Sequence, residues 1–145
     1  MKNPEVEILG NEEWCTLNQM GVPLIKARVD SGAKTSSIQA NKIKVFKNGM
    51  EDWVRFEVNP IQDNRSINLL FKAKLLDMRS VKSSHGISEE RPVIKTQVQI
   101  GNDHFEIELT LANRDTMEYR MLLGREALND RYLVNPSKSF CKGEF

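Results

Sequence analysis

The chain has 145 residues, of which 21 are lysine or arginine and 20 are aspartate or glutamate, so its formal charge at neutral pH is +1. This length suits one domain, which we expect to span residues 1–145, and is too short for two lobes with an active site between them. The balanced charge argues against a nucleic-acid partner, and no apolar run reaches the roughly 18 residues that a membrane span needs. Without an apolar leader either, the sequence favours a cytoplasmic protein.

Short stretches rich in β-branched and aromatic residues recur along the chain between turn residues, and they predict strands. We expect strands at residues 6–9, 13–17, 25–29, 43–46, 53–58, 67–76, 93–100, 105–111, 119–123 and 132–134, with a weaker alternation at 37–40. One short helix is predicted at residues 124–129. Many short strands with one brief helix favour an all-β protein with a closed β-barrel.

The connections between these strands differ in character. Asn48 and Gly49 predict a tight hairpin, because both positions of such a turn tolerate a positive φ. The segment 67–76 fits a strand or a helix, and its neighbours favour a strand. The segment 78–91 is polar and rich in serine, and it precedes Pro92 and the strand at 93–100.

The strand predicted at 25–29 ends directly before an acidic residue. Its alternation of apolar and basic residues predicts a half-buried strand, which stops at Asp30. Ser31 and Gly32 follow, and the glycine lets the backbone turn sharply, so a carboxylate stands at the end of a strand. Taken alone, this tripeptide fits an ordinary turn in which the aspartate caps its own backbone.

A second element gives the tripeptide more weight: an apolar run at 121–123 ends in Gly124, and a short helical stretch follows. With this element the chain resembles the bacterial and archaeal retropepsin-like aspartic endopeptidases, often labelled ATP-dependent zinc proteases. The resemblance rests on residues 27–37, 83–86, 113–115 and 121–125, and it extends from about Trp14 to Phe140. It implies a closed retropepsin-like β-barrel with one short helix.

The resemblance implies that Asp30 is the catalytic residue, that the Ser31 hydroxyl fixes the turn across a two-fold axis, and that Gly32 allows close backbone approach. Most relatives have threonine where this chain has Ser31, which keeps the hydroxyl. Aspartic proteases use two carboxylates that share one proton, and this sequence has one Asp-Ser-Gly. A homodimer is therefore expected from the mechanism as well as from the resemblance.

Further roles follow from the same resemblance. Residues expected to bind a peptide or protein substrate are Ala33, Lys34, Ser84, His85 and Gly86. Residues expected to support the turn from beneath are Leu122, Leu123, Gly124 and Arg125. The segment 78–92 stands where retroviral relatives have a flap over the substrate, and an ordinary solvated loop is the alternative. The cation of Lys34 would favour ionised carboxylates and so either move activity toward neutral pH or impair proton sharing.

Other chemistries fit less well. A zinc protease needs His-Glu-x-x-His or an equivalent cluster, and the chain has only His85 and His104. Cys15 and Cys141 are interpreted as packing thiols in a reducing compartment, so we expect no metal and no other cofactor. A Ser-His-Asp triad lacks a Gly-x-Ser-x-Gly motif, and residues 32–35 lack the glycines of a phosphate loop.

The rival to a peptidase is a non-catalytic peptide-binding module of the same fold. Relatives tend to accompany ATP-grasp ligases that add glutamates to protein tails. The resemblance therefore implies such a ligase system as a partner and such a tail as a substrate or ligand.

Overall fold

The computed structural model describes residues 6–59, 68–82, 86–113 and 119–143. The strands are β1 (Glu7–Leu9), β2 (Glu12–Leu17), β3 (Val22–Val29), β4 (Ser36–Gln39), β5 (Asn41–Asn48), β6 (Glu51–Val58), β7 (Leu69–Lys74), β8 (Asp77–Lys82), β9 (Ser88–Ile100), β10 (Asp103–Ala112), β11 (Met121–Leu123) and β12 (Tyr132–Val134). The helical elements are η1 (Asn18–Met20), a single 3-10 turn, and α1 (Arg125–Leu128). In this part of the chain no helix is long and apolar enough to cross a bilayer.

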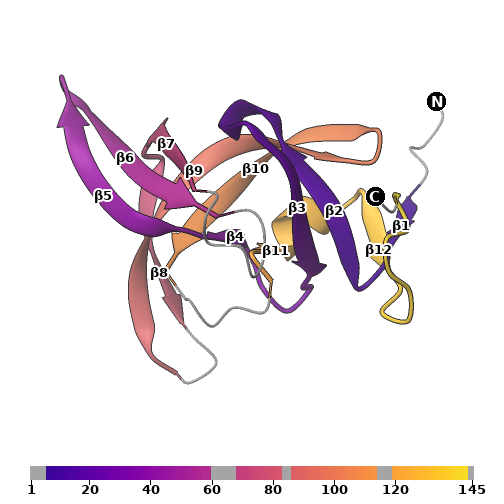
Figure 1. The fold of residues 1–145 in the computed structure, drawn as a ribbon. Helices are drawn as coiled ribbons and strands as arrows, with labels where there is room; N and C mark the ends of the chain where they lie inside the picture. Colours follow the sequence, from indigo (N-terminus) through magenta and orange to yellow (C-terminus); the bar gives the residue numbers. More distant parts are fainter. Residues whose placement is uncertain (1–5, 60–67, 83–85, 114–118, 144–145) are drawn as a thin grey trace, which may run out of the picture.

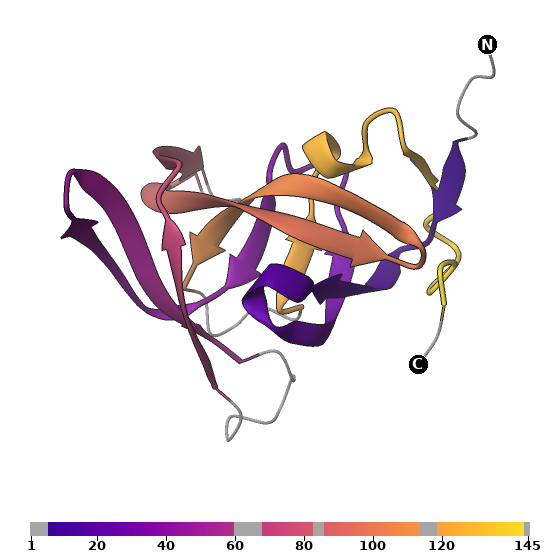
Figure 2. The same ribbon diagram turned by 90° about the horizontal axis from the view of Figure 1, so that it is seen from above.

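A closed barrel forms the centre of the molecule (Figure 1). Its strands follow the order β10-β4-β11-β3-β2-β9, and β9 pairs antiparallel with β10 from Val93 to Ile100, which closes the ring. β11 lies between β3 and β4, parallel to the first and antiparallel to the second. Figure 2 shows α1 over one side of the barrel, beside the β9–β10 hairpin. The predicted all-β fold with a closed barrel and one short helix is confirmed.

Period-two alternation fills the barrel with apolar side chains. In β2, for example, every second residue is buried: Cys15 and Leu17 are apolar, and the third, Glu13, is an exception whose carboxylate accepts backbone N–H groups. The largest fully buried apolar side chains are Leu9, Leu17, Ile25, Ile38, Phe56, Ile94, Ile100, Leu109, Leu111, Met121 and Leu123. Burial of this apolar surface is the main force that closes the barrel.

Two smaller sheets flank the barrel. β5, β6 and β7 form an antiparallel sheet whose inner face contributes Val54, Phe56 and Val58 to the common core. Its outer part projects to the upper left of Figure 1. β1 and β12 form a parallel pair at the opposite end of the molecule. The sequence predicted these strands but not their separation from the barrel.

For residues 78–92 a flap or an ordinary solvated loop was expected, and the described part of this segment is β-structure rather than a solvated loop. β8 and the first half of β9 pair antiparallel from Asp77–Val93 to Lys82–Ser88, so the segment is a hairpin. Pro92 lies in β9, one residue before the pairing with β10 begins at Val93. At Pro92 the strand therefore pairs with β8 alone. A proline is tolerated at such a position, because a strand with one partner does not need every backbone N–H.

Candidate active site

The turn after β3 fixes the orientation of the Asp30 carboxylate. The backbone N–H of Asp30 donates to the carbonyl oxygen of Leu123 at 2.9 Å, which extends the pairing of β3 with β11. The N–H of Gly32 donates to Oδ1 of Asp30 at 3.0 Å, and the N–H of Ala33 donates to the Asp30 carbonyl oxygen at 3.2 Å. The aspartate does cap its own turn, and this half-buried carboxylate is thereby held in one place.

Arg125, the first residue of α1, binds the same turn. Its Nη1 donates to the carbonyl oxygens of Ser31 at 3.0 Å and Gly32 at 3.1 Å. Its backbone N–H donates to the carbonyl oxygen of Ala33 at 2.7 Å. The guanidinium and the backbone N–H of this one residue thus donate to three successive carbonyl oxygens. These hydrogen bonds fix the turn to the start of α1.

Gly124 allows β11 and α1 to approach the turn closely. A Cβ at this position would lie 2.6 Å from the backbone carbonyl carbon of Thr35, closer than packed atoms can come. The N–H of Gly124 donates to Oγ of the buried Ser36 at 3.0 Å. Glu126 adds two contacts: its N–H donates to the carbonyl oxygen of Lys34 at 3.0 Å, and its Oε1 accepts from the Thr35 hydroxyl at 2.8 Å. A larger residue than glycine would push α1 away.

A groove of about 480 Å³ opens between the turn and the β8–β9 hairpin. Residues 32–35 of the turn and residues 79–82 of β8 line it, and the barrel strands contribute Ser37, Thr110 and Leu122. The groove therefore offers a concave surface next to the Asp30 turn, as a substrate site requires.

The charged side chains that line this groove are all basic. Its charged residues are Lys34, Arg79, Lys82 and Arg91, and none of the described residues that line it is acidic. Arg79 forms an ion pair with Glu108 at 2.9 Å, and the hydrogen bond with Glu108 raises the pKa of Arg79 above its usual value. Positive groups gathered in a cleft favour the binding of anionic ligands.

The structure brings part of the predicted substrate site together. Ala33 and Lys34 line the groove, whereas Gly86, in the hairpin with a φ of 79°, does not. Ser84 and His85 lie outside the described residues. Leu122 lines the groove, and the other three residues predicted to support the turn, Leu123, Gly124 and Arg125, bond to the turn or to Ser36 behind it.

Sequence reasoning missed several residues of this site. Arg79, Lys82 and Arg91 reach the groove only because β8 pairs with β9, and a polar segment without alternation does not predict that pairing. Thr35 and Ser36 hold α1 through their hydroxyl groups. The signal for these two was present, because both follow directly in the stretch that carries the family resemblance.

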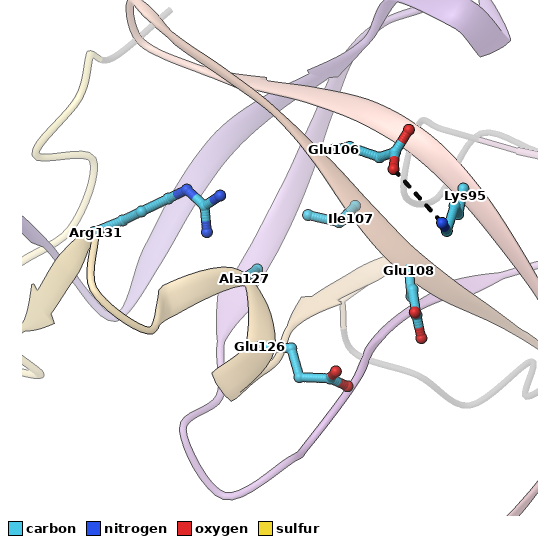
Figure 3. Close-up of a pocket in the computed structure, with 7 residues that line it drawn as sticks. All are labelled: Lys95, Glu106, Ile107, Glu108, Glu126, Ala127 and Arg131. Carbon is cyan, nitrogen blue, oxygen red and sulfur yellow. Dashed lines mark ion pairs between the residues drawn. The ribbon is translucent and has the colours of Figure 1, made fainter.

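A second cavity, of about 260 Å³, lies between α1 and the β9–β10 hairpin (Figure 3). Its carboxylates are engaged: Glu106 pairs with Lys95 at 3.9 Å, Glu108 pairs with Arg79, and Glu126 accepts from Thr35. Glu108 and Glu126 lie on facing elements, β10 and α1. Since Arg79 and Thr35 line the groove, Glu108 and Glu126 of this cavity help to position two residues of the groove.

The described residues include no group of three His, Cys, Asp or Glu side chains placed to hold a metal ion. Cys15 is buried in β2 and Cys141 is exposed, and both are free thiols. Burial raises the pKa of the Cys15 thiol well above its usual value, so this cysteine is an inert packing residue at neutral pH.

Comparison with known proteins identifies the family. The model of the RimB-like family, described as retropepsin-like aspartic endopeptidase RimB, matches residues 8–144. The chain belongs to the RimB-like family. The resemblance drawn from the sequence is thereby confirmed.

Several curated relatives of this RimB-like chain carry a different description. A protein of Shewanella pealeana, called a probable alpha-L-glutamate ligase, is 57% identical over 137 residues, which is 94% of this chain and 30% of the relative. A protein of Desulfotalea psychrophila with the same description is 48% identical over 138 residues, again 30% of its length. The chain thus spans about a third or less of the length of these relatives.

A solved structure supports the RimB-like fold. The crystal structure of a Legionella pneumophila protein of unknown function matches with a TM-score of 0.78 and 26% sequence identity, and the match covers 96% of this chain and 100% of that protein. The barrel and its flanking sheets therefore recur in a protein with a quite different sequence.

Proposed function

We propose that this chain is an aspartic peptidase of the retropepsin type that acts as a homodimer. The observation that carries the proposal is the Asp30 turn: a carboxylate at the end of a barrel strand, held by Gly32 and braced by Arg125, beside a groove. Membership of the RimB-like family supports this interpretation. A rigid, preorganised carboxylate next to a concave surface is what general acid–base hydrolysis needs.

The need for a second copy follows from the chemistry. One carboxylate cannot act as base and acid in the same step, and the sequence contains one Asp-Ser-Gly. Two copies related by a two-fold axis would place Asp30 opposite Asp30. Two carboxylates at such short range share one proton, because both cannot ionise cheaply.

In this arrangement the ionised Asp30 removes a proton from a water molecule, and the oxygen of that water attacks the carbonyl carbon of the scissile peptide bond. The protonated Asp30 of the second copy donates a hydrogen bond to the carbonyl oxygen, which stabilises the charge that develops there. The tetrahedral intermediate then collapses: the C–N bond breaks, the nitrogen takes up a proton, and a carboxylic acid and an amine leave.

The substrate class in this proposal is an acidic peptide, such as a protein tail that carries added glutamates. Two observations support it, namely the positive groove beside the turn and the glutamate-ligase description of the relatives. A ligase that lengthens such tails would be the natural partner of a peptidase that shortens them. A cytoplasmic location belongs to the same proposal.

Mixing of subunits tests the proposal. Asp30→Asn should abolish cleavage of acidic peptides, whereas Asp130→Asn, at an exposed aspartate outside the turn, should not. Random pairing of equal amounts of parent and Asp30→Asn chains leaves about a quarter of the dimers with two aspartates, so activity per parent chain should fall to about half. Activity that stays constant on mixing would contradict a shared centre.

The second candidate is a non-catalytic peptide-binding module. It is favoured by the relatives, which are described as ligases and are about three times longer than this chain. Binding of an acidic peptide without cleavage at any pH, by parent and Asp30→Asn alike, would support the module. Cleavage that is lost in Asp30→Asn and blocked by a statine-type inhibitor would support the peptidase.

A further inference from the structure

The four basic side chains of the groove fall into two groups. Arg79 is paired with Glu108 at 2.9 Å and Asp77 at 3.4 Å, and Arg91 is paired with Glu89 at 2.7 Å. These two arginines are already engaged within the fold, and Arg91 is almost fully buried. They contribute to the electrostatic field of the groove, but each already binds a carboxylate of this chain.

Lys34 and Lys82 are different. Both are exposed, both line the groove, and neither forms an ion pair with any residue that the structure describes. A lysine side chain is a flexible point charge that can follow a ligand, and an exposed ammonium retains much of its hydration until a partner arrives. Among the groove residues, these two ammonium groups are the ones free to bind an incoming carboxylate.

Their positions are complementary. Lys34 comes from the turn that follows β3, whereas Lys82 comes from β8 in the hairpin on the opposite side of the groove. The barrel strands contribute three uncharged residues to the lining, namely Ser37, Thr110 and Leu122. These residues belong neither to the turn nor to the hairpin. Successive side chains of an extended peptide point to opposite sides, so neighbouring residues of a bound chain would face the two lysines in turn.

We infer that Lys34 and Lys82 are specificity-determining residues that bind two adjacent acidic side chains of the substrate, one from each side of the groove. This inference rests on the proposed peptide substrate but not on its cleavage. It assigns the selection of adjacent acidic residues to the two unpaired lysines and excludes the two paired arginines from it. Peptides with acidic residues at alternate positions present both carboxylates to one side and should bind less well.

Binding to the Asp30→Asn variant tests the inference without any need for catalysis. The probes are fluorescent peptides of one sequence with Glu-Glu, Glu-Gln, Gln-Glu or Gln-Gln at adjacent positions, and a fifth with Glu-Gln-Glu. Lys34→Gln and Lys82→Gln should each weaken binding of the Glu-Glu peptide about tenfold and leave the Gln-Gln peptide unchanged. Lys47→Gln, on the distant β5 and paired with Asp52 at 2.8 Å, is the matched control and should change neither.

The peptides with a single glutamate show which lysine binds which glutamate of the peptide. If each lysine binds one glutamate, Lys34→Gln should weaken one of the Glu-Gln and Gln-Glu peptides and Lys82→Gln the other. Lys82→Glu should reverse the preference on its side, so that a lysine in the peptide replaces the glutamate. Equal loss of affinity for all five peptides, or equal affinity of the parent for Glu-Glu and Gln-Gln, would overturn the inference.

The experiments distinguish failure of the peptidase proposal from failure of the inference about the two lysines. If parent protein binds Glu-Glu peptides with the predicted lysine dependence but does not cleave them, the peptidase proposal fails and the inference stands. If parent protein cleaves Gln-Gln and Glu-Glu peptides with equal kcat/KM, and the lysine variants do the same, the inference fails and the peptidase proposal stands.

Discussion

Asp30 owes its position to contacts that each come from a different part of the chain. Its own turn supplies the N–H of Gly32, β11 supplies the carbonyl of Leu123, and α1 supplies the guanidinium of Arg125. Together these contacts decide where the carboxylate lies. Arg125 is the one among them that can be changed without altering the backbone.

Arg125→Lys should lower kcat for an acidic peptide about tenfold while KM and the melting temperature change little. A lysine ammonium cannot hold the carbonyl oxygens of Ser31 and Gly32 as one guanidinium does, so the turn loses its fixed geometry. Arg125 is exposed, and its replacement therefore leaves no buried charge behind. Steady-state kinetics and thermal unfolding are the measurements, with Arg28→Lys on the exposed side of β3 as the control.

A drop in melting temperature that parallels the loss of activity would assign Arg125 to stability alone. An unchanged kcat would remove it from the positioning of Asp30.

Buried polar contacts help to hold the strands near the two ends of the chain to the barrel. The buried carboxylate of Glu13 accepts backbone N–H groups of Gly10 at 2.7 Å, Cys141 at 2.9 Å and Lys142 at 3.0 Å. These bonds fasten the segment after β12 to the start of β2. Such charge-assisted bonds compensate for the cost of burying a carboxylate.

A second polar contact joins β10 to β12. The Tyr132 hydroxyl donates to Oδ2 of Asp103 at 2.6 Å, and Lys142 lies 3.5 Å from the same oxygen. The hydrogen bond from Tyr132 lowers the pKa of Asp103. Burial, together with this hydrogen bond, raises the pKa of Tyr132. Both shifts favour the pair in which Asp103 is ionised and Tyr132 is neutral.

The stability contributed by Asp103 should therefore depend on pH. Because its pKa is lower in the folded than in the unfolded chain, ionised Asp103 stabilises the fold above the unfolded pKa of about 4 and loses this effect as the pH falls further. The melting temperature of the parent should exceed that of Asp103→Asn at neutral pH, and the difference should shrink below about pH 4. Thermal unfolding across this pH range is the measurement.

Tyr132→Phe provides the control for this pH dependence. In that background the effect of Asp103→Asn should be smaller and should vary less with pH, because the hydrogen bond is already absent. A difference between parent and Asp103→Asn that stays constant down to strongly acidic pH would contradict the assigned role of Tyr132.

At the scale of the molecule, alternation and turn residues predict the barrel strands well, because those strands have one face in the core. Residues 105–111, for example, alternate clearly and lie in β10. The β8–β9 hairpin was missed because β8 is an edge strand with no fully buried residue, and its sequence does not alternate between apolar and polar residues. The positive groove depends on that pairing and could not be predicted without it.

The site shows the same division. The Asp30 turn and the residues that pack against it, Leu123 and Gly124, lie in two short stretches with recognisable sequence patterns. The sequence analysis could therefore predict these residues. Contacts between segments far apart in the chain, such as Arg79 with Glu108 or Thr35 with Glu126, depend on the register of strands. Local patterns do not determine that register.

The central claim is that two copies of this chain build one reaction centre. A crystal structure of the protein bound to a statine-type peptide tests it most directly, through the distance between the two Asp30 carboxylates. The account predicts a symmetric dimer in which the two carboxylates lie about 3 Å apart, close enough to share a proton, with the inhibitor hydroxyl between them. A monomer, or a dimer whose Asp30 side chains face away from each other, would contradict it.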